Sequence, residues 1–93
     1  MKIPNTNYNI TESGVITNEH DKILKHQYVK GRARLGLVIN GKRKNMQIHR
    51  LIAQTFLEHK IKGKPFDVKF IDGNYRNLKL SNLSINFRKV IKL

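Results

Sequence analysis

Apolar and polar positions alternate most clearly between residues 32 and 48. The run from Arg32 to Ile39 is followed by Asn40-Gly41, and a second run from Lys42 to Ile48 comes directly after it. Alternation with a period of two is typical of a strand with one buried face. Asn-Gly between two such runs is a strong signal for a type I′ turn. The pattern therefore predicts a long antiparallel hairpin over residues 32–48.

The two-residue turn also fixes the pairing across this hairpin, because a slip of one residue would exchange its two faces. In this register Ala33 lies opposite Ile48 at the open end. We expect one face to be apolar and to form part of the core: Ala33, Leu35, Leu37, Ile39, Met46 and Ile48. The other face is polar, with Gly36 and Val38 among Arg32, Arg34, Arg43, Asn45 and Gln47.

The spacing changes to that of a helix after the hairpin. Ile48, Leu51, Ile52 and Phe56 recur at i, i+3, i+4 and i+8, which predicts a helix over about residues 48–57. We expect a loop from Lys60 onward.

The remaining extended segments are shorter. Residues 66–71 and 83–87 read as two strands that can pair with each other, joined by a polar loop in which Leu78 and Leu80 point inward. Residues 8–10, 14–16 and 22–25 read as short extended pieces before the long hairpin. Together these elements predict a small α+β fold.

Length and composition limit the class of protein. The chain has 93 residues, which favours one small domain over residues 1–93. No apolar run approaches the roughly 20 residues of a membrane span. The absence of cysteine excludes disulfides and thiolate zinc sites. No apolar leader is visible near Met1, so we expect an intracellular protein.

The charge points to a polyanionic partner. Lys and Arg number 19 against six Asp and Glu, a net charge of +13, and residues 22–57 contain no acid. Such a balance opposes compaction and favours nucleic acid as a partner. Arg, Asn and Gln are also the side chains that read guanine and adenine edges. The polar hairpin face is thus a candidate DNA contact, or alternatively a plain solvated face.

Sequence motifs for other chemistry are missing. The four His residues lack the spacing of a helical zinc site, and neither a Gly-rich phosphate loop nor a nucleophile motif occurs. We therefore predict no cofactor.

Three segments carry a family resemblance. Residues 48–56, I-H-R-L-I-A-Q-T-F, resemble the V-H-R-L-V-A-x-x-F helix of phage-type HNH homing endonucleases. Residues 68–74, followed by Asn77 and Asn82-Leu83, are similar to that family's V-[ND]-H-x-D-G-N…N-N…N-L segment. Residues 8–16 resemble its small N-terminal module. The resemblance implies an N-terminal sheet module (8–47) and an HNH-like segment (48–93) that forms a degenerate ββα-metal hairpin.

The resemblance also implies where catalysis would be located. HNH nucleases use a His general base and a bound divalent cation. Here Phe70 stands at the position of the base, Lys69 at an adjacent metal ligand and Ile91 at the last ligand. Phe cannot accept a proton, and an ammonium group repels a cation. We expect no metal site, and structural roles for the remaining motif residues His49, Asp72, Asn74, Asn77 and Asn82.

The prediction is a non-catalytic, DNA-binding protein of phage or mobile-element type, in the cytoplasm of the host cell. Its candidate DNA-binding residues are Arg32, Arg34, Arg43, Asn45, Gln47, Lys69 and Arg76. One alternative is a phage-encoded inhibitor that binds an acidic surface of a host or defence protein. A second alternative is an active nicking endonuclease with displaced ligands.

Overall fold

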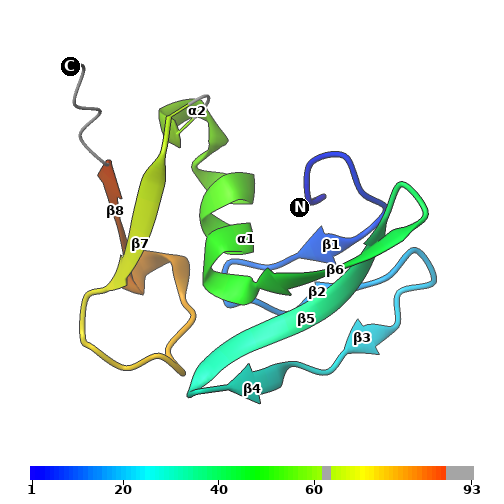
Figure 1. Ribbon diagram of the computed structural model, residues 1–93, viewed down its shortest axis with the longest axis horizontal. Coiled ribbons are helices and arrows are strands. Elements are labelled where there is room, and N and C mark those ends of the chain that lie inside the picture. Colours follow the sequence, from blue (N-terminus) through cyan, green and yellow to red (C-terminus); the bar gives the residue numbers. More distant parts are fainter. Residues whose placement is uncertain (62–63, 88–93) are drawn as a thin grey trace.

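Short antiparallel sheets around one main helix make up the described part of this computed structural model, residues 1–61 and 64–87 (Figure 1). The predicted α+β class is confirmed. No helix among these residues is long and apolar enough to cross a membrane. The expectations for Ile91 and the rest of residues 88–93 lie outside the described range.

The N-terminal half contains two three-stranded antiparallel sheets. Adjacent strands in each sheet are consecutive in the chain. The first sheet contains β1 (Asn9–Ile10), β2 (Ile16–Thr17) and β3 (Ile23–Leu24), and the second contains β4 (Gln27–Val29), β5 (Arg32–Ile39) and β6 (Lys42–Gln47). The short strand β4 pairs with the start of β5 and was not predicted.

The long hairpin has the predicted turn and register. Asn40 and Gly41 have φ values of 52° and 75°, which a type I′ turn requires. Leu35 pairs with Met46, and Ile39 pairs with Lys42. The predicted pair of Ala33 with Ile48 is wrong, because Ile48 begins the next helix and β4 provides the partner of Ala33. Ile39, next to the exposed turn, and Met46, opposite Leu35 near the other end of the hairpin, are only partly buried.

The main helix α1 (Ile48–Phe56) begins without a loop after β6, as predicted. Figure 1 shows it between the N-terminal sheets and the last hairpin. Leu51 and Ile52 are fully buried, whereas Phe56 is only partly buried. The loop expected from Lys60 is wrong at its start, because α2 (Glu58–Ile61) adds a short helical segment that buries Ile61.

The last hairpin consists of β7 (Phe66–Phe70) and β8 (Leu83–Phe87), which pair antiparallel from Phe66 opposite Phe87 to Phe70 opposite Leu83. Its first strand is one residue shorter than predicted, and Ile71 is exposed. The connecting loop ends in a 3₁₀ turn, η1 (Leu80–Asn82). Leu78 in this loop is buried, and Leu80 is partly buried, as expected.

A glycine joins the N-terminal turn to the helix and the loop. Gly14 has a φ of 89°, and a Cβ added there would lie 3.2–3.3 Å from side-chain atoms of Ile48, Ile52 and Leu78. The Leu80 N–H donates to the Glu12 carbonyl nearby (2.8 Å). The main core therefore extends from the first sheet through α1 to the last hairpin, as one packed cluster.

Candidate nucleic-acid interface

The polar residues of the long hairpin share one face of the second sheet. The pairs Arg34–Gln47, Gly36–Asn45 and Val38–Arg43 follow one another along it. A Cβ added at Gly36 would lie only 2.7 Å from Nε of Arg43, so the guanidinium of Arg43 lies across the backbone of β5. A larger side chain at Gly36 would shift this guanidinium, which is the far end of a flexible and exposed side chain. The face is consequently flat and basic at its centre.

Arg34 is more buried than Arg43. It is half-buried beside its β4 pairing partner Gln27, and its Nε is buried with no hydrogen-bond partner among the described residues. A buried unpaired donor costs free energy unless a ligand or water satisfies it.

A cavity of about 440 Å³ opens beside the first turn of α1. It is lined from the sheet, the helix, β7 and the following loop by Arg32, Gln47, His49, Arg50, Asp67, Val68, Lys69, Phe70, Gly73 and Tyr75. Arg32 and Gln47 also belong to the polar face of the hairpin, so that face continues into the cavity. The structure thus brings Lys69 together with two of the hairpin candidates.

The other predicted contacts lie outside this cavity. Arg34, Arg43 and Asn45 occupy the sheet face, and Arg76 places its guanidinium 4.3 Å from the centre of the Tyr28 ring. Arg76 thereby ties the last loop to β4. The candidate residues form two adjoining groups rather than one.

Aromatic rings form one wall of the cavity. The rings of His49 and Phe70 are 5.1 Å apart, and those of Phe70 and Tyr75 are 5.2 Å apart in an edge-to-face arrangement. Arg32 lies 4.8 Å above the Tyr75 ring. Phe70 therefore lies between the rings of His49 and Tyr75, and the guanidinium of Arg32 packs on the Tyr75 ring.

His49 is neutral at physiological pH. It is 6% exposed, and its Nδ1 has no hydrogen-bond partner within the described chain. Burial lowers its pKa to about 4, and the positive charges of Arg50 and Arg32 act in the same direction. The neutral imidazole carries a proton on only one ring nitrogen, so that nitrogen can donate a hydrogen bond and the other can accept one.

Arg50 and Tyr75 line the cavity but were not among the predicted site residues. Arg50 donates to the Phe66 carbonyl (3.1 Å) and lies 4.3 Å above the Phe66 ring. The helix motif includes Arg50, but sequence spacing alone does not show that it faces β7. Tyr75 precedes Arg76 in a loop whose course only the tertiary structure establishes.

The loop after β7 is held by a hydrogen-bonded set of motif residues. Asn82 accepts from the Asp72 N–H (3.1 Å) and donates to Oδ1 of Asp72 (2.9 Å) and to the Asn77 carbonyl (3.0 Å). Asp72 also accepts from the Asn74 N–H (2.8 Å) and from Nδ2 of Asn77 (2.9 Å). Hydrogen bonds from Asn77, Asn74 and Asn82 lower the pKa of Asp72 below its usual value.

A divalent cation does not fit the residues of this cavity. Only His49 and Asp67 among its lining residues are common metal ligands, and Lys69 places an ammonium group beside them. The described residues contain no group of three His, Cys, Asp or Glu side chains that could hold a metal ion. Asp72, the nearest motif carboxylate, already accepts hydrogen bonds within its own loop.

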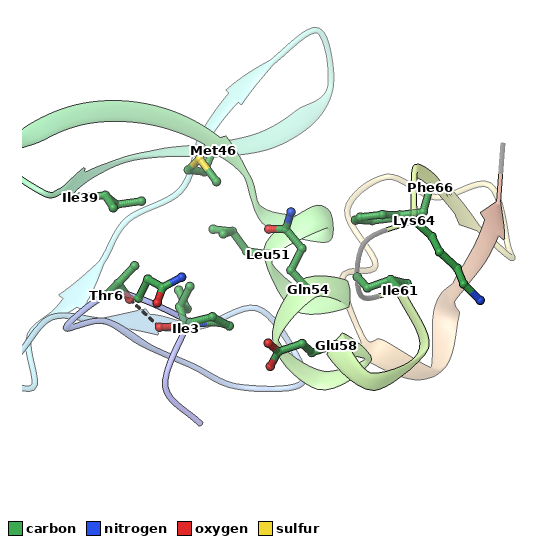
Figure 2. Close-up of a pocket in the computed structure, with 12 residues that line it drawn as sticks. Ile3, Thr6, Ile39, Met46, Leu51, Gln54, Glu58, Ile61, Lys64 and Phe66 are labelled. Carbon is green, nitrogen blue, oxygen red and sulfur yellow. Dashed lines mark hydrogen bonds between the residues drawn. The ribbon is translucent and has the colours of Figure 1, made fainter. Parts of the chain in front are cut away.

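A second hollow, of about 450 Å³, lies toward the C-terminal end of α1. Figure 2 shows the residues that line it, which include apolar Ile3, Ile39, Met46, Leu51, Ile61 and Phe66 and polar Gln54, Glu58 and Lys64. Its walls are mainly aliphatic, and Glu58 introduces a negative charge. It lacks the cluster of cations that distinguishes the cavity beside the first turn of α1.

Comparisons with known proteins identify a related nuclease. The DNA endonuclease I-HmuI of Bacillus phage SP01 is 42% identical over 85 residues, which cover 89% of this chain and 45% of the relative. A solved structure that describes DNA binding and cleavage by the HNH homing endonuclease I-HmuI matches with a TM-score of 0.80 at 34% identity. This match covers 92% of the present chain and 51% of the other. No family model matches.

The chain spans about half the length of the relatives that it matches. The agreement extends over the N-terminal sheets, α1 and the last hairpin, because 92% of the chain is superimposed. In both sequence and structure the chain is similar to an HNH homing endonuclease of phage type.

Proposed function

We propose that this chain binds duplex DNA and does not cut it. The observation that carries the proposal is that Lys69 and Phe70 line the cavity beside α1, since the resemblance to the HNH motif puts these residues at the positions of a metal ligand and the His base. Phe70 offers no lone pair to deprotonate a water molecule. The solved I-HmuI structure describes DNA binding and cleavage, so a chain of this fold without that chemistry would keep the binding alone.

The polar sheet face and the cavity would form one continuous DNA-binding surface. Arg34 and Arg43 would contact phosphates or guanines, and Asn45 and Gln47 are placed to reach base edges. Arg32 and Gln47 connect this face to the cavity, where Lys69 would meet the backbone. Arg76 would lie beside β4 of the same sheet, because its guanidinium packs on the ring of Tyr28.

A nicking assay tests the absence of catalysis. Supercoiled plasmid is incubated with the purified chain in Mg²⁺ or Mn²⁺, with EDTA as the control. We expect no nicked product from the wild type or from Phe70→His, since that variant still has Lys69 beside the new imidazole. EDTA-sensitive nicking by the wild type would establish the active-endonuclease alternative and contradict the proposal.

Fluorescence anisotropy with a labelled duplex at about 0.15 M salt tests the binding surface. Arg34→Ala and Arg43→Ala should weaken binding, and each lost phosphate contact should reduce the log–log salt slope by about one unit. Asn45→Ala should change sequence preference more than overall affinity. Glu12→Gln, a change in an exposed turn residue of the first sheet, is the matched control and should change neither quantity.

The comparisons do not support an acidic host or defence protein as the partner. Such a partner would use the same arginines, so the anisotropy experiment separates the two hypotheses. Unchanged affinity and salt slope in both arginine variants would exclude the sheet face as the DNA contact.

A further inference from the structure

We propose that the cavity beside α1 is a metal-independent site for one phosphate group, and that Phe70 and Tyr75 position Arg32 within it. The natural ligand would be a phosphate of the DNA backbone, and this identification of the ligand rests on the proposed DNA-binding function. The ligand chemistry itself follows from the cavity. Phe70, at the position where the HNH motif has His, would then help to position Arg32 in an anion site.

The charges of the lining residues favour an anion. Arg32, Arg50 and Lys69 line the cavity, and Asp67 is the one carboxylate among the described residues that line it. Arg50 is already engaged with the carbonyl and the ring of Phe66. Arg32 and Lys69 are consequently the two cations with capacity for a ligand.

The first turn of α1 adds to this preference. Gln47 stands at the N-cap without capping the helix through its side chain, and the first turn contains no acidic residue. Gln47, His49 and Arg50 all line the cavity, so it lies beside this turn. An uncapped helix N-terminus carries partial positive charge and unpaired N–H groups, which suit phosphate oxygens.

An unpaired polar atom provides independent support for a ligand. Nδ1 of His49 is buried and has no partner among the described residues, although the side chain lines the cavity and is 94% enclosed, given its exposure of 6%. Buried polar atoms in native proteins nearly always have a partner. A phosphate oxygen that accepts from an Nδ1–H would provide it.

The ring stack explains how Arg32 can be held without a carboxylate partner. Arg32 lies over Tyr75, Tyr75 packs edge-to-face on Phe70, and Phe70 packs on His49. A cation–π contact restrains the guanidinium but leaves its N–H donors unused. These donors can then bind a phosphate in the bidentate geometry that Arg favours.

The direct test uses inorganic phosphate as the probe and follows backbone amide shifts of the intact chain by NMR at constant ionic strength. We expect saturable shifts in the first turn of α1, at Lys69 and at Tyr75, unchanged by EDTA. Shifts confined to other regions, or binding that requires Mg²⁺, would overturn the proposal.

Paired variants separate positioning from general stability. Tyr75→Leu removes the ring beneath Arg32 and should weaken phosphate binding by about fivefold, the order of one cation–π contact. Tyr75→Phe keeps the ring and should stay within about twofold of the wild type. Lys22→Gln, at an exposed lysine outside the cavity, should leave the phosphate affinity unchanged. Equal affinities for Tyr75→Leu and Tyr75→Phe would exclude the positioning role, and thermal melts identify any loss of folding.

The same variants distinguish this site from the wider proposal. If the wild type binds phosphate at the cavity but does not bind duplex DNA, the DNA-binding function fails and the anion site stands. If DNA binds and Lys69→Gln and Tyr75→Leu leave both its affinity and the phosphate shifts unchanged, the site fails and DNA binding stands.

Discussion

The two long hairpins of this protein connect their antiparallel strands in different ways. The hairpin of β5 and β6 closes through Asn40 and Gly41, both with positive φ, and its strands pair over six consecutive positions. The hairpin of β7 and β8 is joined by residues 71–82, which are held by side-chain hydrogen bonds centred on Asp72 and Asn82.

The difference teaches which kind of turn can place a site. A two-residue turn needs only local backbone preferences, and its tip is exposed. The longer loop depends on Asn82, which is buried and reaches back to Asp72 across ten residues of sequence. This loop positions side chains against the second sheet, because it brings Tyr75 to Arg32 and Arg76 to Tyr28.

The largest expected effect comes from the core that both hairpins share. Leu51→Ala should destabilise the fold by about 2–5 kcal/mol, since Leu51 is 1% exposed and truncation leaves a cavity. Phe56→Ala should cost less than a fully buried phenylalanine would, because Phe56 is only partly buried. Urea denaturation measures both, and a wild-type midpoint for Leu51→Ala would contradict the packing described.

Asn82→Ala should come next and act on the second hairpin. It removes three hydrogen bonds from a buried side chain, which we estimate at about 3 kcal/mol. Asn86→Ala, at an exposed position of β8, is the matched control and should change stability little. Equal denaturation midpoints for the two variants would show that the loop does not depend on Asn82.

Asn40→Ala tests the first hairpin and should cost about 1 kcal/mol, because alanine tolerates a positive φ less well than asparagine. Asn40→Gly should retain wild-type stability, since glycine adopts that conformation freely. If both variants lost as much stability as Asn82→Ala, the two turns would not differ in the way proposed.

The smallest effect should be the contribution of Asp72, in the loop of the second hairpin, to the dependence of stability on acidic pH. The hydrogen bonds to Asp72 lower its pKa in the folded state, so the unfolded chain binds the proton more readily. The associated stability is present above the ordinary pKa of 3.8 and is lost as pH falls through the lower folded value. Denaturation of wild type and Asp72→Asn across this range should show a smaller loss in the variant, with Glu12→Gln as the control.

Local signals predicted much of the fold. The alternation of residues 32–48, the Asn-Gly turn and the apolar stripe of α1 led to the observed register and helix, because each depends on neighbours in sequence. β4 escaped prediction, since its three residues are all exposed and show no alternation of burial. Ile48 was predicted in both the strand and the helix, because a helix that begins directly after a strand has no turn residues between them.

The candidate site was predicted only in part. The chain's own residues indicated a basic face, which is a property of composition and alternation, and the resemblance to the HNH motif implied the substitutions at Lys69 and Phe70. The enclosure of His49, the stack from Phe70 to Arg32 and the division of the basic residues into two groups depend on contacts between elements far apart in sequence. Sequence determined which charges and rings this protein has, and tertiary packing decided which of them meet, because only packing brings β5, the start of α1 and the loop after β7 to one cavity.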